Sequence, residues 1–554
     1  MAAAPETIKN HASFIWSVAD LLRGDYKQSE YGKVILPLTV LRRFDCVLAP
    51  VKGDMLTRFD QLKGKVENFG PILDQLTEIE GLWNISAFDI PKLLNDPDNI
   101  RDNLLNYLAG FSPEAREILD RFEFATQITR LHRAGLLYMV LSKFADLDLH
   151  PDQVSNLEMG YLYEELIRRF SELSNETAGE HFTPREVIRL MVNLLFIEDD
   201  DILSKPGAKA TLYDPACGTG GMLSVAEDYV RSQNSQATLH VYGQELNAET
   251  YAICRSDMML KGQNASNIKL GNSLKKYDPE DPGDQGDQHP TERFDYLLAN
   301  PPFGVEWKKV ADSVQHEHQS LGFAGRYGAG LPRINDGSFL FLQHMVSKMK
   351  PADQGGSRLA IVFNGSPLFT GAAGSGESEI RRWIIENDWL EAVVALPDQL
   401  FYNTGISTYF WIVTNRKAKN RKGRVQLIDA RQSFAKMRKS LGEKRKEISE
   451  QQLNEIVRLY GNFDQQQSED DEARVKIFNN EKFGFLRITV ERPLRLKWEV
   501  TEASADALLA DKRLAKLDSE VRDALAEHAR GSAGKQFDSD AEARKQAKQW
   551  MADL

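Results

Sequence analysis

Seven short apolar runs rich in β-forming residues, separated by stretches with helical periodicity, restrict the possible folds of this chain more than any other feature. The runs are ATLYD (210–214), TLHVYGQE (238–245), FDYLLAN (294–300), RLAIVFN (358–364), EAVVALP (391–397), TYFWIVTN (408–415) and RVQLIDA (424–430). Strands that alternate with helices form a largely parallel sheet with helices on both faces. The sequence therefore predicts an α/β fold, with a Rossmann-like domain over residues 156–465.

The segments on either side of this domain have a different pattern. Residues 13–160 show helical periodicity almost throughout, which places the first domain at residues 1–155, and in SFIWSVADLLRG one helix face carries Phe14, Ile15, Val18, Leu21 and Leu22. We therefore expect an N-terminal all-helical domain. Residues 466–554 are rich in charge and end in helix-forming sequence, which predicts a C-terminal helical interaction segment.

Charge and cysteine content narrow the function classes. The net charge of −12 argues against a chain that binds nucleic acid over its whole surface, because such binding neutralises phosphates with Lys and Arg. Cys46, Cys217 and Cys254 have no metal-ligand spacing, so we expect neither a zinc site nor a disulfide framework. No apolar run approaches the roughly 20 residues of a membrane span. The N-terminus has no secretory signal pattern, which favours the cytoplasm.

The segment TLYDPACGTGGML (211–223) joins the end of a predicted strand to a glycine-rich turn and the start of a helix. In a parallel sheet, such a turn lets a cofactor approach the backbone at the carboxyl ends of the strands. Leu223 stands where the third glycine of G-x-G-x-x-G is required. The dinucleotide-binding fingerprint is therefore incomplete.

Two acids stand at the ends of successive predicted strands. Asp214 precedes the glycine turn, and Glu245 ends the next strand. Glu245 can accept hydrogen bonds from both ribose hydroxyls of an adenosine, and Asp214 can receive a cationic amino group. A cofactor with a ribose, an ammonium group and no phosphate fits this pattern, and S-adenosylmethionine has that description. The alternative is a strand-to-helix turn whose glycines serve only tight packing.

A second glycine segment, GAAGSGES (371–378), matches a phosphate-binding loop except that Glu377 replaces the lysine. A carboxylate repels the phosphates that the lysine attracts. We interpret the segment as a flexible loop before a helix and expect no NTPase activity.

The segment FDYLLANPPFG places Asn300, Pro301, Pro302 and Phe303 at the end of a later strand. Both prolines have a fixed φ and lack an N–H, and Asn300 is held extended because it precedes a proline. The Asn300 side-chain oxygen and the Pro301 carbonyl can accept the two hydrogens of an exocyclic amino group, while Phe303 can stack on the base. A base in a duplex reaches such a pocket only by flipping. The alternative is a proline-stiffened strand exit.

A third motif, EHFTPREVIRLMV, begins at Glu180. Thr183 to Glu186 fit a capping box, with Pro184 at the first helical position and Phe182 and Val187 as a hydrophobic staple. On this interpretation the motif is only a well-formed helix start.

In combination and in this order, EHFTPR, DPACGTGG, the strand end at Glu245 and NPPF resemble the modification (methyltransferase) subunits of type I restriction-modification systems. The stretch LLRGDYKQSEYGKVILPLTVLRRFD also resembles the opening domain of that family, and the resemblance covers about residues 10–460. It implies a methyltransferase fold that uses S-adenosylmethionine, and transfer of a methyl group to N6 of adenine in DNA.

The resemblance also implies functional residues. The flipped adenine would be held by a catalytic group of Asn300, Pro301, Pro302 and Phe303. The cofactor would be bound by Glu180, His181, Phe182, Thr183, Pro184, Arg185, Asp214, Ala216, Gly218, Thr219, Gly220, Gly221, Glu245 and Asn272. Many relatives have Asp at the position of Asn272, and a simple turn asparagine is the alternative there. No metal is implied.

The family's partners are double-stranded DNA and a separate specificity subunit that selects the target sequence, with two modification subunits for each specificity subunit. A restriction subunit, which is a nuclease or translocase, is a further candidate partner, and no membrane is involved. The sequence agrees with this division, because nothing after about residue 430 alternates like a β-rich recognition domain. Methylation of an RNA base or a protein amide, and a non-catalytic assembly role, are the competing interpretations.

Two basic runs are local exceptions to the net negative charge of the chain. They are RKAKNRKGR (416–424) and MRKSLGEKRK (437–446), which are either phosphate contacts or solvated faces.

An apolar stripe marks the C-terminal segment. In ASADALLADKRLAKLDSEVRDALAEHAR, near-helical spacing relates Leu508, Leu509, Leu514, Leu517, Val521 and Leu525. Such a stripe covers either the chain's own core or a partner helix, and we favour the partner.

Overall fold

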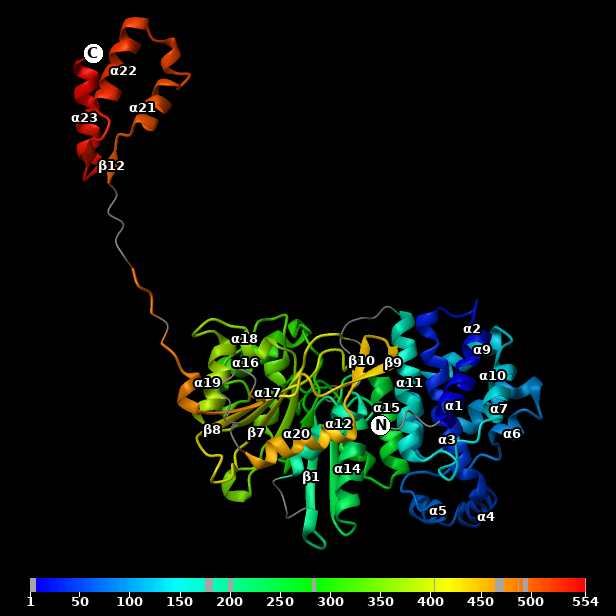
Figure 1. The fold of residues 1–554 in the computed structure, drawn as a ribbon. Coiled ribbons are helices and arrows are strands. Elements are labelled where there is room, and N and C mark those ends of the chain that lie inside the picture. Colours follow the sequence, from blue (N-terminus) through cyan, green and yellow to red (C-terminus); the bar gives the residue numbers. More distant parts are fainter. Residues whose placement is uncertain are drawn as a thin grey trace. The chain divides into compact units, whose positions relative to one another are not determined.

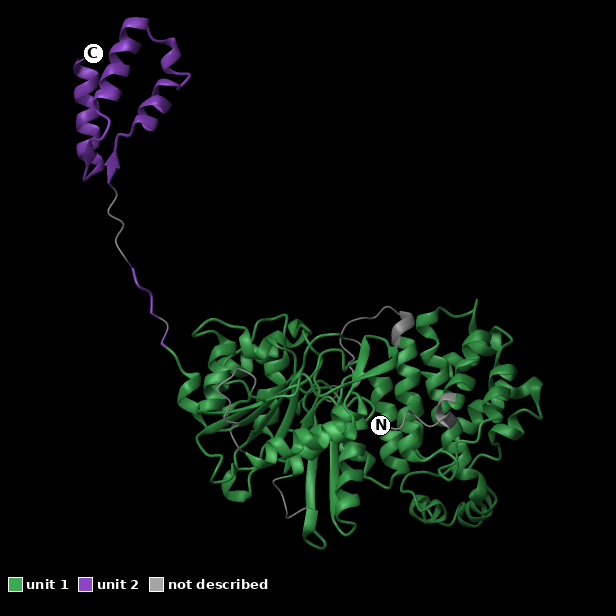
Figure 2. Ribbon diagram, in the orientation of Figure 1, with its two compact units in different colours: residues 1–485 green, residues 486–554 purple. Residues whose placement is uncertain are grey.

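The structure is a computed structural model that describes residues 6–174, 183–197, 203–280, 285–402, 404–463, 473–486, 488–491 and 497–553. Contacts divide the chain into two compact units, residues 1–485 and residues 486–554 (Figure 2). Within the described residues, no helix is long and apolar enough to cross a membrane.

The N-terminal part of the first unit is helical, as predicted (Figure 1). Its helices are α1 (Glu6–Trp16), α2 (Val18–Leu22), α3 (Gly32–Leu48), α4 (Lys52–Leu62), α5 (Gly70–Thr77), α6 (Ile90–Leu93), α7 (Ile100–Ala109), α8 (Pro113–Asp120), α9 (Phe124–Arg133), α10 (Leu137–Ala145) and α11 (Asn156–Ser174). Their apolar faces meet in one core, which also takes in Ala252 and Ile253 from a helix of the α/β region. The helical region is therefore packed directly onto the region that follows it.

A nine-stranded sheet forms the centre of the α/β region, in the order β11-β8-β6-β7-β5-β4-β1-β2-β3. The strands are β1 (Lys209–Asp214), β2 (Thr238–Glu245), β3 (Ile268–Leu270), β4 (Tyr296–Ala299), β5 (Arg358–Phe363), β6 (Leu390–Ala395), β7 (Tyr409–Thr414), β8 (Arg424–Asp429) and β11 (Val475–Asn479). Only the pairings of β7 and β11 are antiparallel, so the predicted largely parallel sheet is confirmed. Because β11 lies beyond residue 465, the sheet continues past the limit predicted for this domain.

Helices cover both faces of the sheet, as the alternation predicts. They are α12 (Arg185–Phe196), α14 (Gly221–Gln233), α15 (Ala248–Leu260), α16 (Ala311–Leu321), α17 (Ser338–Ser347), α18 (Ser366–Phe369), α19 (Gly376–Glu386) and α20 (Glu450–Asn462). In β5, Ala360 and Val362 share a core with α12 and α20, whereas Leu359 and Ile361 share one with α17 and α19. Successive side chains of a strand point to opposite faces, so one strand contributes to both cores.

The start of α19 differs from the flexible loop expected for residues 371–378. Ser375 caps this helix, and the Glu377 carboxylate is buried and accepts a hydrogen bond from the Arg333 backbone N–H at 2.9 Å. Glu377 therefore holds the long connection after β4 against α19.

The second unit contains α21 (Glu502–Leu509), α22 (Ser519–Gly531) and α23 (Asp540–Asp553), with a short pairing of β12 (Trp498–Glu499) and β13 (Gln536–Phe537). The helical stretch of the sequence is interrupted, because a 3₁₀ turn over Leu514–Lys516 separates α21 from α22. Within the stripe, Leu508, Leu517 and Val521 are exposed.

Candidate active site

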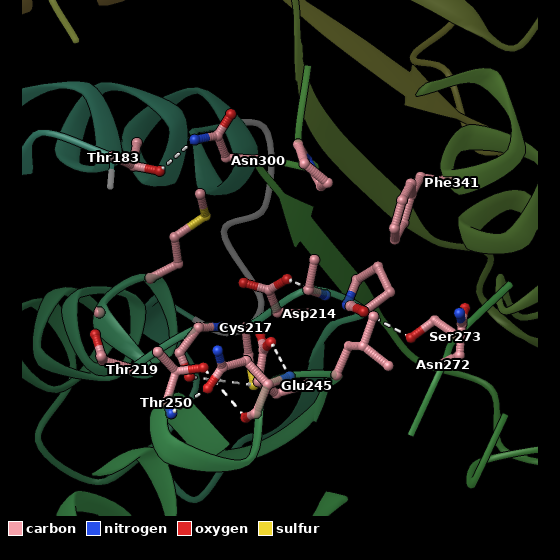
Figure 3. A pocket seen from close by; sticks show the side chains of 18 of the residues that line it. Thr183, Asp214, Cys217, Thr219, Glu245, Thr250, Asn272, Ser273, Asn300 and Phe341 are labelled. Atoms are coloured by element: carbon pink, nitrogen blue, oxygen red, sulfur yellow. Dashed lines mark hydrogen bonds between the residues drawn. The ribbon is translucent and has the colours of Figure 1, made fainter. Parts of the chain in front are cut away.

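The carboxyl ends of four neighbouring parallel strands, β4, β1, β2 and β3, surround one cavity of about 440 Å³ (Figure 3). Asp214 ends β1, Glu245 ends β2, Asn272 follows β3 and Asn300 follows β4. Of the site residues predicted from the sequence, those lining the cavity are Thr183, Asp214, Ala216, Gly218, Thr219, Gly221, Glu245, Asn272, Asn300 and Pro302. The volume suits a cofactor-sized ligand, and this edge of the sheet is where α/β folds bind ligands.

The other predicted residues do not line this cavity. Glu180, His181 and Phe182 lie outside the described residues. Pro184, Arg185, Gly220, Pro301 and Phe303 are described but are not among the lining residues. Buried Arg185 forms an ion pair with Glu164 at 2.6 Å, and Gly220 has a φ of +82° and leaves no room for a Cβ beside the Cys254 sulfur. The structure thus places these two residues behind the cavity.

Several lining residues were missed by the sequence analysis. Glu164 comes from α11 and Phe341 from α17, far from any of the motifs. Cys217 and Ser273 lie beside predicted residues, and their positions soon after strand ends were the only local signal, whereas Thr250 lies in the first turn of α15. Long-range packing brings the first two residues to the site, so no local pattern could have identified them.

Glu245 fixes the glycine turn through its carboxylate. Oε2 accepts the Gly218 backbone N–H at 2.8 Å, and Oε1 accepts the Asn247 backbone N–H at 2.8 Å. Asn247 in turn caps α15, because its side-chain oxygen accepts the backbone N–H groups of Glu249 and Thr250. A carboxylate oxygen can accept more than one hydrogen bond, so Glu245 is able to receive hydroxyl donors as well.

Asp214 is buried at the centre of the cavity wall (Figure 3). Burial raises the pKa of its carboxyl to about 8, and the nearby charge of Glu245 acts in the same direction. One hydrogen bond from the Ala216 backbone N–H to Oδ1, at 3.0 Å, offsets only part of this effect. A buried acid of this kind becomes a favourable partner for a cation that enters the cavity.

Asn300 is held by a residue of the upstream motif. Its side-chain Nδ2 donates to Thr183 Oγ1 at 2.8 Å (Figure 3). The amide nitrogen is thereby directed toward Thr183, and the carbonyl oxygen projects from the other side of the amide. Phe303, which follows in the same turn, packs edge to face against Phe401 with ring centroids 6.0 Å apart.

This arrangement rules out the capping-box interpretation of Thr183 to Glu186. Helix α12 begins at Arg185 with Pro184 as its N-cap and no side-chain cap. The Thr183 hydroxyl is bonded to Asn300 instead, and buried Glu186 forms an ion pair with buried Lys444. The predicted staple partner Phe182 lies outside the described residues.

The site fits S-adenosylmethionine. Asp214 is a buried acid that a cation would complement, Glu245 carries acceptors for a ribose, and the glycine turn leaves the backbone accessible. The described residues that line the cavity include no lysine or arginine that could pair with a phosphate. Fold and site together define a methyltransferase that depends on S-adenosylmethionine.

Comparison with known proteins places the chain within this class. Residues 155–482 match the sequence model of the N-6 DNA Methylase family, and residues 11–144 match the HsdM N-terminal domain. The chain belongs to the N-6 DNA methylase family, whose members transfer a methyl group to N6 of adenine in DNA.

Curated relatives and solved structures agree with this assignment. The MjaIX methylase subunit of a type I restriction enzyme from Methanocaldococcus jannaschii is 24% identical over 82% of this chain and 78% of its own length. The HindI methylase subunit from Haemophilus influenzae is 31% identical over 50% of this chain and 54% of its own length. A type I restriction-modification methyltransferase subunit from Streptococcus thermophilus shares the fold, with a TM-score of 0.64, 22% identity and coverage of 86% of this chain and 96% of its own.

Cofactor binding is expected to release protons at neutral pH. The pKa of Asp214 is about 8 in the free protein, and a bound cation lowers it, so binding converts the acid to its carboxylate. Affinity for S-adenosylmethionine should therefore rise by up to about tenfold per pH unit between pH 6 and 7, and level off above pH 8. Calorimetry in two buffers of different ionisation enthalpy measures the proton release. An Asp214→Asn variant should lose both the affinity and the proton release, and a wild-type chain that releases none would contradict this role for Asp214.

Proposed function

We propose that this chain is the modification subunit of a type I restriction-modification complex and methylates adenine at N6 within a target sequence chosen by a separate specificity subunit. The supporting observation is that Asn300 lies at the same cavity as Asp214 and Glu245 in a chain of the N-6 DNA methylase family. DNA and other subunits of the system are its partners, with two copies of this chain for each specificity subunit.

In this proposal the cavity holds the cofactor on the β1 and β2 side. Asp214 receives the amino group, Glu245 receives the ribose hydroxyls, and the backbone of Gly218 to Gly221 lies against the ligand. Asn272 lies near the cofactor's adenine. When bound, S-adenosylmethionine supplies an electrophilic methyl carbon.

The target adenine enters on the β4 side, next to the turn in which Asn300 and Pro302 line the cavity and Pro301 and Phe303 flank it. The Asn300 side-chain oxygen and the Pro301 carbonyl accept the two hydrogens of its N6 amino group, which aims the nitrogen lone pair away from them. Pro301 and Pro302 carry no N–H, so the turn presents acceptors to a group that is purely a donor. Thr183 fixes the Asn300 amide through the bond to Nδ2, and Phe303 offers an aromatic ring to the base. The flipped base is thus oriented before reaction.

The second unit, residues 486–554, is the proposed docking element for the specificity subunit. Leu508 and Leu517 are each 43% exposed and Val521 is 38% exposed, so the folding of the second unit leaves part of the stripe uncovered. An uncovered apolar stripe of this kind suits a partner helix.

A methylation assay with and without the specificity subunit tests the proposed function. The full chain alone is expected to methylate DNA slowly and without sequence preference, and to become site-specific on adding the partner. A chain ending at residue 485 should keep its fold and its cofactor binding, because residues 1–485 form a separate compact unit, but should no longer co-purify with the partner. Incorporation of labelled methyl groups and mapping of N6-methyladenine provide the measurement.

Three results would contradict the proposal. Robust site-specific methylation by the chain alone would remove the need for a specificity subunit. Transfer to RNA or protein in preference to DNA would change the substrate class. Retention of the partner by residues 1–485 would move the docking surface away from the C-terminal unit.

A further inference from the structure

The two basic runs of the sequence lie at opposite edges of the sheet. Strand β7 is antiparallel to β5, with Tyr409 opposite Phe363 and Thr414 opposite Arg358. Residues 416–424 follow the end of β7 and therefore lie at the amino ends of the parallel strands. Strand β8 runs parallel to β6 back to the carboxyl edge, and the hairpin of β9 (Ala435–Leu441) and β10 (Lys444–Glu447) follows it there. Only the second run is at the edge that carries the active site.

The first run, residues 416–424, forms contacts mainly within the protein. Lys417 is buried and pairs with Asp388 at 2.6 Å. Arg421 is buried and donates to Gln426 and to the Tyr460 carbonyl. These two cations stabilise the turn between β7 and β8, whereas Lys419 and Lys422 are exposed.

The β9–β10 hairpin is fixed to the protein where its second strand begins, next to the turn between the strands. Buried Lys444 forms the ion pair with Glu186 and also donates to the Leu400 carbonyl at 3.0 Å. The Arg445 backbone N–H donates to the Gln399 carbonyl at 3.0 Å. These bonds hold the hairpin on residues 399–402 and on the first turn of α12.

Both anchoring segments also touch the motif proposed to hold the target base. Glu186 is three residues after Thr183, whose hydroxyl is bonded to Asn300. Leu400 precedes Phe401, whose ring packs against Phe303. The hairpin is therefore built onto the same side of the cavity as Asn300 and Phe303.

The remaining charge of the hairpin is basic and faces solvent. Lys436, Arg438, Lys439 and Arg445 are exposed, and no ion pair of theirs occurs within the part of the chain that the structure describes. Residues 435–447 of the hairpin contain six lysines and arginines and two acids, Glu443 and Glu447. In a chain with a net charge of −12, this is a local concentration of uncompensated positive charge beside the active site.

We infer that the β9–β10 hairpin binds phosphates of the DNA strand next to the flipped adenine. The inference rests on the proposed function and adds a substrate-binding surface to it. Flipping a base costs a few kcal/mol, and contacts that hold the flanking backbone offset that cost. Because the chain has a net charge of −12, such contacts must be local, and the exposed lysines and arginines of the hairpin supply them.

A pair of double variants tests the inference in the full chain assembled with its specificity subunit. Arg438→Gln with Lys439→Gln removes two positive charges from the hairpin, and Lys419→Gln with Lys422→Gln removes the same charge from the opposite edge. The hairpin variant is expected to bind a duplex about tenfold more weakly, and the slope of log K against log salt should become shallower by roughly one for each phosphate that the variant no longer neutralises. The control should match wild type in both measurements.

Binding of S-adenosylmethionine, measured by calorimetry, should be the same in all three complexes. Wild-type DNA affinity and salt slope in the hairpin variant would overturn the inference. Failure of the variant to assemble would also overturn it, because the hairpin would then meet an acidic surface of the specificity subunit. The proposed function fails separately, if the wild-type complex binds the cofactor but does not methylate DNA, since DNA binding is measured independently of methylation.

Discussion

Replacement of Asn300 by alanine is expected to lower the rate of methyl transfer by roughly 100- to 1000-fold. The side chain accepts a hydrogen from the N6 amino group in our proposal, and this hydrogen bond orients the nitrogen during reaction. Asn300 belongs to the β4 side of the cavity, away from Glu245, so the dissociation constant for S-adenosylmethionine should stay within about threefold of wild type. Single-turnover transfer of a labelled methyl group and calorimetric titration measure the two quantities.

Two further variants show whether this effect is specific. Thr183→Val removes the bond that directs the Asn300 amide, and a smaller decrease of roughly tenfold is expected, because the acceptor remains but is less well oriented. Asn387→Ala changes an exposed asparagine at the end of α19 and should leave transfer unchanged. Near-normal turnover in Asn300→Ala would show that the base is oriented by other groups.

Replacement of Glu245 by alanine is expected to weaken binding of S-adenosylmethionine by roughly 100-fold or more. The change removes the acceptors for the ribose and also leaves the Gly218 and Asn247 backbone N–H groups without their carboxylate. The glycine turn is then without the carboxylate that fixes its shape. Calorimetric titration of the full chain gives the affinity, and the transfer rate at saturating cofactor shows how much activity can be recovered.

Matched substitutions separate the effect of the Glu245 charge from the effect of its hydrogen-bond acceptors. Glu245→Gln keeps one oxygen that can accept a hydrogen bond, so an intermediate decrease in affinity of roughly tenfold is expected. Glu386→Ala removes an exposed carboxylate from α19 and should not change cofactor affinity. If Glu245→Ala binds the cofactor as wild type does, the ribose lies elsewhere and the assignment of the β2 end is wrong.

The fold elements and the two central motifs were predictable because their signals are local. Short apolar runs rich in β-forming residues identified the seven segments that became β1, β2 and β4 to β8. Glycines at positive φ, such as Gly218 and Gly220, fit the turn after β1, and prolines stiffen the exit from β4. Once the strands are parallel neighbours, their carboxyl ends meet at one edge, which is why Asp214, Glu245 and Asn300 could be grouped in advance.

The reversed direction of β7 was not predictable in the same way. An apolar run has the same pattern whichever way the strand points, so the sequence of TYFWIVTN does not distinguish parallel from antiparallel pairing. The partners decide it, because β7 is inserted between β5 and β6 and pairs antiparallel to both. That reversal sends one basic run to the edge away from the site and leaves the other beside it.

Local sequence preference determined the secondary structure of this chain, whereas tertiary packing determined which side chains are in contact. The sequence determined which segments become strands, turns and helices, because neighbouring residues impose those conformations through φ limits, side-chain periodicity and missing N–H groups. The tertiary structure alone decided which side chains meet. Thr183 bonds to Asn300 across 117 positions, and Lys444 pairs with Glu186 across 258, at the cost of the capping box that the local sequence favours. A buried charged group needs a partner, because an unpaired charge in the protein interior is unfavourable. Which partner it meets depends on how the whole chain packs.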